Sequence, residues 1–387
     1  MLKIPIGQLQ QLVKINSVSG NEKTIALFLE TKLRSLGFAT KRQKVAQNRF
    51  NLLAEKGAGD RSILFYGHQD TVSVAKNWQT DPFKLCQRGD QLFGLGARDM
   101  KSGLVAIMEA IRVFPGKEGR IKIAFCVDEE NISLGAHRLL DSGWVKDVSL
   151  VVSADSGAVI GKNPLPIRYI LGRRGRCVAQ VTIPGRTAHG AFPEQGINAI
   201  SEASKFVLDL KKFFQPRHGK LGKASLFVRQ IQSQVSGLSL PEQTTLEIDK
   251  QLVPGESPEA FVDKMFRFGV RLYQRGVLEP SLKKSFQVIL KPRSTPYLLP
   301  YCQTRRNKKV FQIEKVIKTI CGRVEPHYAY SVADDNLLAQ KLEAPVVCLG
   351  TEGGNAHQAN EWVSKKSLLA LIKIYRQIIK KLPLFLG

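Results

Sequence analysis

Four apolar runs of strand length constrain the fold of this chain more than any other feature of its sequence. Each run is rich in Val, Ile, Leu and Phe at both odd and even positions, a pattern typical of strands that are buried on both faces. The runs are residues 62–66, 121–127, 150–153 and 345–349. Helical patterns lie between them, notably at residues 103–114 and 134–142. Strands that alternate with helices predict an α/β protein built around a layered, mostly parallel sheet.

The first helix of this fold is expected directly after residues 19–22. Their sequence, Ser-Gly-Asn-Glu, fits the capping box, in which the first and last side chains bond the free N–H groups of a helix start. Apolar residues then recur at helical spacing from Ile25 to Leu36, and Gly37 supplies the stop.

A different pattern separates residues 173–292 from the rest of the chain. Strand and helix signals follow one another here in the order strand, helix, strand, strand, helix, strand. We therefore expect residues 1–172 and 293–387 to form one domain, and residues 173–292 to form an α+β domain inserted into it.

Side chains that can bind a metal follow each of the four apolar runs. They are His68 and Asp70 after the first run, Glu129 and Glu130 after the second, Asp155 after the third and His357 in the glycine-rich loop after the fourth. A further carboxylate, Asp99, ends a loop that contains Gly94 and Gly96. In an open α/β sheet, ligands bind outside the carboxyl ends of the strands. We therefore expect these side chains to converge on one metal site.

The ligand set indicates which metal and which chemistry to expect. Two imidazoles with several carboxylates and no thiolate suit zinc, and they also tolerate cobalt or manganese. Two ions that share a bridging carboxylate can activate one water for attack on a carbonyl carbon. Glu129 and Glu130 would point in opposite directions if the chain were still extended there, so that one binds metal while the other accepts the proton of the water. Asp70 would fix the tautomer of His68.

Each of these segments, taken alone, has a simpler structural interpretation. The segment around His68 could be a strand end with a capped turn, Glu129 and Glu130 a solvated helix start, and Asp155 a turn residue. The joint placement of five ligand-bearing segments at strand ends is what favours a metal site. His189 lies apart from them, in the inserted domain, where it would donate to a developing oxyanion only if that domain closes over the site.

These residues resemble a known family of zinc hydrolases, which includes acetylornithine deacetylase, succinyl-diaminopimelate desuccinylase, aminoacylase and glutamate carboxypeptidase. The similarity extends over most of the chain, from residue 17 to residue 361. The motifs that carry it are residues 67–72, Trp78 with residues 81–83, residues 94–103, residues 128–130, residues 185–189 with 193–200, and residues 356–357 with Glu361. The resemblance implies a homodimer in which the inserted domain is both a lid and the dimerisation domain.

The resemblance also implies a role for each candidate ligand. His68 and Asp155 would bind one zinc ion, Glu130 and His357 would bind the other, and Asp99 would bridge the two.

The remaining roles that the resemblance implies concern proton transfer. Glu129 would be the general base and afterwards the acid that protonates the leaving amine. His189 would reach the active site of the partner subunit and stabilise the oxyanion.

The sequence departs from the family pattern at several positions, and the positions of Leu238 and Gln251 can contact substrate in relatives. Asp155 is followed by Ser-Gly where many members have Glu followed by Pro, Leu238 stands where an Asn is frequent, and Gln251 replaces an Arg. The loop of residues 350–355 also differs from the usual Gly-Pro-Gly. We assign no substrate-binding residue, although four arginines could bind a substrate carboxylate: Arg173, Arg174, Arg176 and Arg186.

Composition excludes some other classes of protein. No apolar run approaches the roughly 18 residues that a membrane span needs, and the first 19 residues lack the apolar core of a signal peptide, so we expect a cytoplasmic protein. The net charge of +25 is spread over short clusters without aromatic interleaving, which does not favour nucleic-acid binding. The six cysteines contain no CxxC pair and predict neither a disulfide framework nor a thiolate metal site.

These observations predict a two-zinc amidohydrolase that acts on an N-acyl-L-amino acid. A dipeptidase or carboxypeptidase would use the same residues on a short peptide. A non-catalytic protein that binds an anionic polymer is a more distant alternative, because such a protein would not need Glu129 beside Glu130.

Overall fold

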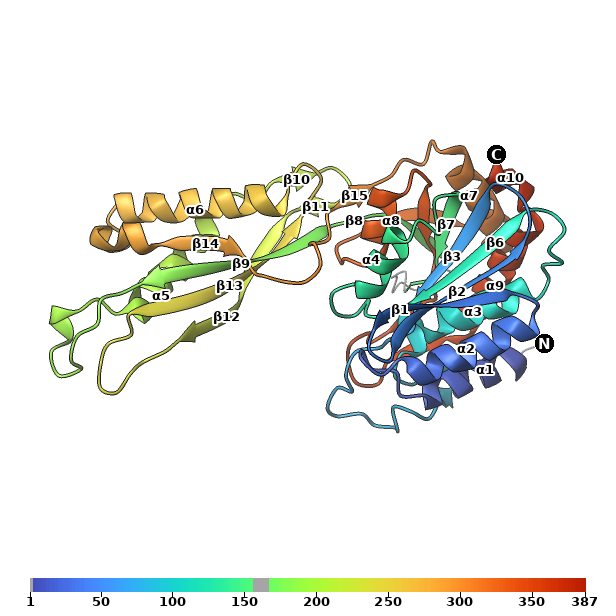
Figure 1. Ribbon diagram of the computed structural model, residues 1–387, viewed down its shortest axis with the longest axis horizontal. Helices are drawn as coiled ribbons and strands as arrows, with labels where there is room; N and C mark the ends of the chain where they lie inside the picture. Colours follow the sequence, from blue (N-terminus) through green and yellow to red (C-terminus); the bar gives the residue numbers. More distant parts are fainter. Residues whose placement is uncertain (1–2, 156–166) are drawn as a thin grey trace. The chain divides into compact units, whose positions relative to one another are not determined.

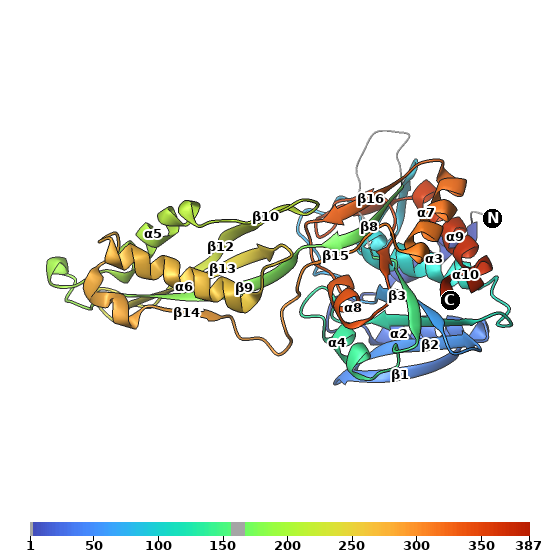
Figure 2. The ribbon, with the colours of Figure 1, turned by 90° about the horizontal axis from the view of Figure 1, so that it is seen from above.

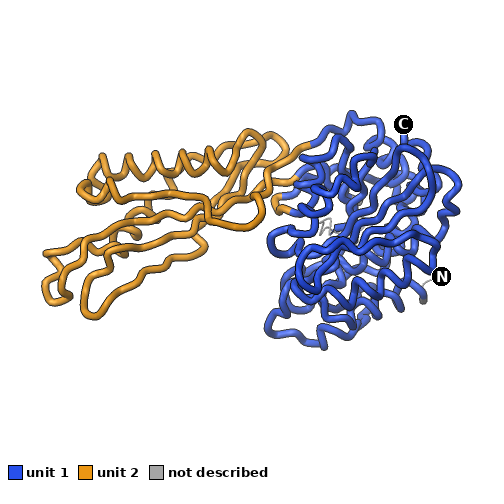
Figure 3. Tube along the Cα trace, in the orientation of Figure 1, with its two compact units in different colours: residues 1–172, 303–329, 333–387 blue, residues 173–302, 330–332 orange. Residues whose placement is uncertain are grey.

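The computed structural model describes residues 3–155 and 167–387 of the chain (Figure 1; Figure 2 gives the view from above). The chain divides into two compact units (Figure 3). Unit 1 comprises Met1–Gly172, Gln303–Ala329 and Ala333–Gly387, and unit 2 comprises Arg173–Cys302 and Tyr330–Val332.

Unit 1 is built around a large sheet whose centre is parallel, as the sequence predicts. The parallel strands are β3 (Ser62–His68), β6 (Arg120–Cys126), β7 (Val148–Ser153) and β17 (Val346–Cys348). Antiparallel strands flank them: β1 (Ala39–Ala46) and β2 (Arg49–Gly57) on one side, β8 (Ile167–Arg173) on the other, with β16 (Val324–Ala329) also paired to β8. Within unit 1 the strand order is β1-β2-β6-β3-β7-β17-β8. β17, from late in the chain, thus lies between β7 and β8.

Helices cover both faces of this sheet. The larger layer consists of α1 (Lys3–Lys14), α2 (Lys23–Ser35), α3 (Ser102–Ile111), α7 (Lys308–Cys321), α9 (Lys365–Lys380) and α10 (Pro383–Leu386). Alternate strand residues such as Ile63 and Phe65 pack into this layer, where Phe65 meets Tyr375 edge to face at 5.3 Å between ring centroids. The smaller helices α4 (Leu134–Asp141) and α8 (Asp335–Lys341) lie on the opposite face (Figure 2). Burial on both faces explains the nearly continuous apolar runs of the central strands.

A second, small sheet of unit 1 carries two of the predicted ligand loops. Its order is β18 (Gly353–Gly354), β19 (Trp362–Ser364), β5 (Gln91–Phe93) and β4 (Cys86–Arg88). The loop with His357 connects β18 to β19, and the irregular helical turn η1 (Ala97–Lys101), which contains Asp99, follows β5.

The prediction of a capping box at the start of α2 is wrong. The residue before the helix is Glu22, which makes no side-chain bond to the N–H groups of the helix start. Its carboxylate instead accepts the N–H of Gly20 and pairs with Arg49, while the Ser19 hydroxyl donates to Asp70. The side chains of this motif therefore bond residues at the ends of β2 and β3 rather than the N–H groups of the helix start.

Unit 2 is an antiparallel sheet with two helices packed on one face. The strand order is β12 (Ser225–Ser233), β13 (Gln243–Leu252), β9 (Gly175–Pro184) and β14 (Gln287–Leu290). The helices α5 (Ala199–Asp209) and α6 (Pro258–Gln274) bring Phe206 and Phe268 together at 5.8 Å between ring centroids over a core of their own. Its shorter elements are η2 (Pro193–Gln195), η3 (Leu210–Lys212), β10 (Arg217–His218), β11 (Gly222–Lys223), η4 (Pro280–Ser285) and β15 (Tyr301–Cys302).

Across the described ranges of both units, none of the helices combines the length and the hydropathy that a bilayer-spanning segment needs.

Candidate metal centre and active site

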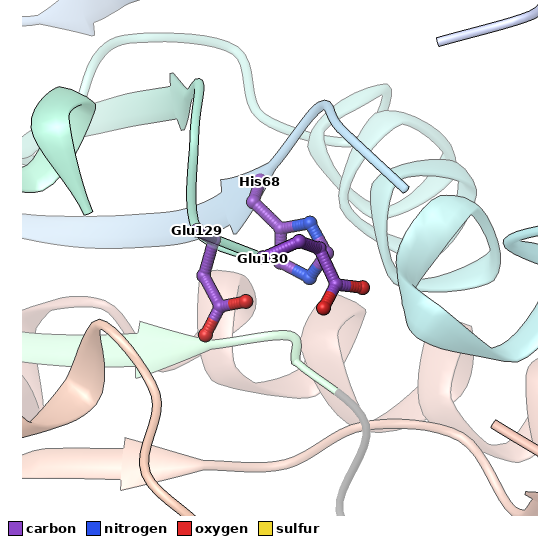
Figure 4. Close-up of side chains that lie close together, drawn as sticks. All are labelled: His68, Glu129 and Glu130. Atoms are coloured by element: carbon purple, nitrogen blue, oxygen red, sulfur yellow. The ribbon is translucent and has the colours of Figure 1, made fainter. Parts of the chain in front are cut away.

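The carboxyl ends of the parallel strands bring most of the predicted site residues together. His68 is the last residue of β3, Glu129 and Glu130 follow β6, and Asp155 follows β7. Figure 4 shows the side chains of His68, Glu129 and Glu130 close to one another, and one ligand atom of each lies within 4.8 Å of the others. Residues 129–130 form a turn, so the extended backbone on which the prediction of oppositely directed side chains depended is not present. Ser156 and Gly157, which complete the motif of Asp155, lie outside the described residues.

Two ligand triads meet at Asp99. One triad is His68, Asp99 and Asp155, and the other is Asp99, Glu130 and His357; within each triad, all ligand atoms lie within 4.8 Å of one another. Asp99 Oδ1 lies 3.2 Å from Nε2 of His68, and Asp99 Oδ2 lies 3.5 Å from Nε2 of His357. A single carboxylate therefore faces two imidazoles with different oxygens, which is the arrangement of a bridging ligand.

The outer contact is longer in the triad of His68 than in the triad of His357. Nε2 of His68 lies 4.0 Å from Oδ1 of Asp155, and Nε2 of His357 lies 3.0 Å from Oε2 of Glu130. Each triad offers one imidazole nitrogen and two carboxylate oxygens, a donor set that suits zinc and related divalent ions. By the chemistry of their donors, the residues present therefore fit two ions.

The electrostatics of the cluster also favour cations. Hydrogen bonds to Asp99 and Glu130 raise the pKa of His357 to about 11. Burial alone would lower the pKa of His68, but its hydrogen bond to Asp99 and the nearby carboxylates raise it well above the usual value. The carboxylates thus hold positive charge on both imidazoles, and a metal ion would supply that charge in place of the protons.

Glu129 lies close to His68 and Glu130 but belongs to neither of the two triads that share Asp99. Burial raises its pKa well above the usual value, and the neighbouring Asp334, Asp155 and Glu130 add to that shift against the opposing effect of His68. A carboxyl group with a raised pKa beside a ligand cluster can both take up and release a proton near neutral pH.

Asp70 orients two parts of the site at once. Its backbone carbonyl lies 3.0 Å from Nδ1 of His68, whereas its carboxylate is 3.7 Å from the same nitrogen. The carboxylate accepts the N–H groups of Glu129 at 3.2 Å and Glu130 at 3.1 Å, and the hydroxyl of Ser19 at 2.7 Å. Asp70 therefore holds the turn of the two glutamates as well as the imidazole.

Glu361 is a site residue to which the sequence argument assigned no role. Its carboxylate accepts three backbone N–H groups, from Gly96 and Arg98 at 2.8 Å each and from Asp99 at 2.9 Å. The side chain is buried, and burial raises its pKa to about 7. The sequence signals are its position four residues after His357 and its place in the motif shared with the resembling family.

Asp334 and Asp335, at the start of α8, were not predicted as site residues. The Tyr66 hydroxyl donates to Asp334 at 2.5 Å, and burial raises the pKa of Asp334 to about 6. Asp335 lies with Asp155 and Cys348 in a further group of possible ligands, in which the Cys348 thiol donates to the carbonyl of Asp155 at 3.5 Å. Two consecutive aspartates before a helix were the available signal.

His189 belongs to unit 2, where it is exposed on a loop. Its Nδ1 accepts the N–H of Ala191 at 3.1 Å, and its ring centroid lies 6.1 Å from that of Phe192.

Three of the four arginines considered for substrate binding have partners within unit 2. Arg176 forms an ion pair with Asp249, with 2.6 Å between Nη2 and Oδ2. Arg174 lies 3.8 Å from the ring centroid of Tyr330, and Arg173 donates to Ser331.

Comparison with known proteins identifies the class. Residues 64–381 match the family described as Peptidase family M20/M25/M40. A succinyl-diaminopimelate desuccinylase of Buchnera aphidicola is 26% identical over 97% of this chain and 98% of its own length. An aminopeptidase PepT of Bacillus cereus has a similar structure, with a TM-score of 0.77, 20% identity and coverage of 99% of both chains. A Bacillus subtilis protein described as a dinuclear metal binding peptidase aligns over 98% of both chains, with a TM-score of 0.70 and 15% identity.

The chain therefore belongs to peptidase family M20/M25/M40. It is a hydrolase that acts on amide or peptide bonds, and the resemblance and fold expected from the sequence are confirmed.

Proposed function

We propose that this protein is a two-zinc amidohydrolase that cleaves the amide bond of an N-acyl-L-amino acid. The observation that carries the proposal is the pair of histidine-containing triads that share Asp99, with the half-buried Glu129 beside them. The name of the desuccinylase relative, which this chain matches over almost its full length, supports an acylated amino acid as the substrate class.

The two triads supply the residues that would hold the ions. His68, Asp99 and Asp155 would hold one, Asp99, Glu130 and His357 would hold the other, and cobalt or manganese would substitute for zinc. When bound, two such ions polarise the scissile carbonyl and lower the pKa of the attacking water.

Glu129 is the group that we propose moves the proton. It takes the proton of the attacking water and then delivers it to the nitrogen of the leaving amine, so that one carboxyl group serves both half-steps. Asp70 keeps Glu129 in place through the backbone N–H that its carboxylate accepts.

His189 is the proposed donor to the oxyanion. Because Nδ1 accepts a hydrogen bond from a backbone N–H, the neutral ring carries its hydrogen on Nε2. That tautomer presents the N–H that stabilisation of a developing oxyanion requires.

Residues 173–292 are the proposed lid and dimerisation domain, and residues 1–172 and 293–387 the catalytic domain of a cytoplasmic homodimer. β12 supports the dimer because it is an edge strand with Phe227 and Ile231 about half exposed (55% and 56%). An open strand edge that bears apolar side chains is stabilised when another strand covers it.

The decisive measurement is amine release by zinc-loaded protein from N-acetyl amino acids, N-succinyl amino acids and dipeptides, each with a chelator control. Chelator-sensitive release from acylated amino acids supports the proposal, and the best substrate names the acyl group. Release from dipeptides alone would assign the protein to the peptidases. If no substrate reacts while two ions are bound, the substrate class is wrong.

A further inference from the structure

A buried ion pair network lies behind the turn of Glu129 and Glu130. Arg49, the first residue of β2, donates from Nε to Oε2 of Glu22 at 2.9 Å and from Nη2 to Oε1 of Glu22 at 2.5 Å. The same Nη2 lies 2.8 Å from Oδ1 of Asp128. The side chains of Glu22 and Asp128 are each 1% exposed, and that of Arg49 is 14% exposed.

Asp128 organises the segment that carries the two glutamates. Its backbone has a φ of 72°, in the left-handed region that non-glycine residues seldom adopt. Its Oδ2 accepts the N–H groups of Ile132 and Leu134 at 3.3 Å each, and its carbonyl accepts the N–H of Ser133 at 2.8 Å. One side chain thus closes the loop from the end of β6 to the start of α4, with Glu129 and Glu130 inside it.

The loop is held from two sides. On one side, the carboxylate of Asp70 accepts the N–H groups of both Glu129 and Glu130. On the other side, Arg49 holds Asp128, and through Glu22 it connects the loop to the segment before α2. Because Arg49 forms an ion pair with both Glu22 and Asp128, its removal would leave two buried carboxylates without that partner.

We propose that Arg49 is a positioning residue for the reaction, acting through Asp128 to place the carboxyl groups of Glu129 and Glu130. This inference rests on the proposed function for the roles of the two glutamates. Arg49 touches neither of them directly, so its effect is on geometry. Glu130 belongs to the triad with His357, whereas the triad of His68, Asp99 and Asp155 contains no residue of the loop. Loss of Arg49 should therefore weaken one metal site much more than the other.

The test compares Arg49→Met with the matched variant Arg42→Met. Arg42 also joins a strand of the same sheet to a buried glutamate of α2, with 2.6 Å between its Nη2 and Oε2 of Glu30. Among the described residues, the ion pair of Arg42 is with Glu30 and not with a residue of the loop. Zinc is titrated calorimetrically into each metal-free protein, and kcat and KM are measured on the best substrate of wild type.

For Arg49→Met we expect the affinity of one of the two zinc sites to fall by about 10–100-fold, which is the usual effect of removing a group that orients a metal ligand. We expect kcat to fall by a similar factor and KM to change little. Arg42→Met should keep both sites and kcat. If Arg49→Met fails to fold, Arg49→Lys replaces it; lysine retains the charge but cannot bond both carboxylates in the same geometry, so an intermediate loss is expected.

Two wild-type-like zinc sites and an unchanged kcat in the Arg49 variant would overturn the proposal, as would equal losses in the two variants. If wild type hydrolyses no amide, the proposed function fails, but the calorimetric comparison still decides the role of Arg49.

Discussion

Asp99 presents its two carboxylate oxygens to two different imidazoles, and this geometry determines how the metal-free site is charged. Hydrogen bonds from His357 and His68 hold the pKa of Asp99 well below its usual value, although burial acts in the opposite direction. In the absence of metal, the protons on the imidazoles neutralise the site. Metal and proton therefore compete for the same nitrogen atoms.

This competition predicts that zinc binding releases a proton from His357. Its pKa is raised to about 11 by Asp99 and Glu130, so the ring is protonated at neutral pH and must lose that proton to become a ligand. The apparent affinity for zinc should therefore rise as the pH increases toward 11 and fall in acid. Titration calorimetry in two buffers of different ionisation enthalpy measures the release; a binding enthalpy that is the same in both buffers would contradict it.

The role of Glu129 is tested by Glu129→Gln. The amide keeps the size of the side chain but cannot accept the proton of water, so turnover should fall by about 10²-fold or more, on the scale of general-base catalysis. Both zinc ions should remain, because neither shared triad contains Glu129. Steady-state rates and metal analysis on the same sample check this; normal turnover in the variant would refute the assignment.

At the scale of elements, the loop of Asp99 depends on a side chain far away in sequence. Glu361, just before β19, accepts three N–H groups of the segment that leads from β5 into η1. The bond network joins two loops of the small sheet and fixes the bridging ligand between them.

Glu361→Ala should therefore destabilise the metal-free protein. The substitution leaves one buried and two partly buried N–H groups without an acceptor. At roughly 1–3 kcal/mol for each buried unpaired group, the free energy of unfolding should fall by about 3 kcal/mol. Urea unfolding of the metal-free variant measures the change. A free energy of unfolding within about 1 kcal/mol of the wild-type value would contradict this prediction and show that water replaces the carboxylate as acceptor.

The elements that the sequence predicted well are those that bury both faces. The central strands β3, β6, β7 and β17 are continuous apolar runs, and their ends carry His68, Glu130 and Asp155 because parallel strands present their carboxyl ends to one edge. β1 was missed, since its sequence is charged and largely exposed and shows no clear alternation.

The supporting residues of the site could not be predicted in the same way. The local sequence around Glu22 fits a helix cap, but in the structure Glu22 forms an ion pair with Arg49. Arg49 lies on β2, a strand that the sequence did not predict. Glu361 and Asp334 act on segments more than 200 residues away in the chain. Contacts of this kind depend on tertiary packing and leave no periodic signal.

At the scale of the whole molecule, the proposed homodimer depends on the edge of the unit 2 sheet. Ile231→Asp places a charge on the outward side of β12, where the residue is 56% exposed, so the isolated unit should tolerate it while a covering strand should not. Sedimentation velocity should show a shift from dimer to monomer with unchanged secondary structure. A wild-type protein that sediments as a monomer would refute the dimer.

The position of β17 between β7 and β8 has a consequence for how the protein is made. β7 ends at Ser153 and β17 begins at Val346, so roughly 190 residues, including all of unit 2, leave the ribosome between two strands that pair in the finished sheet. At about 5–20 residues per second, this interval lasts about 10–40 s. During that time the nascent chain already contains His68, Asp99 and Glu130 but lacks His357 and Glu361. The apolar edge of β7 is also without its partner β17. Metal loading is thus expected only after synthesis is nearly complete, and until then the unpaired apolar edge is a site at which the nascent chain is prone to aggregate.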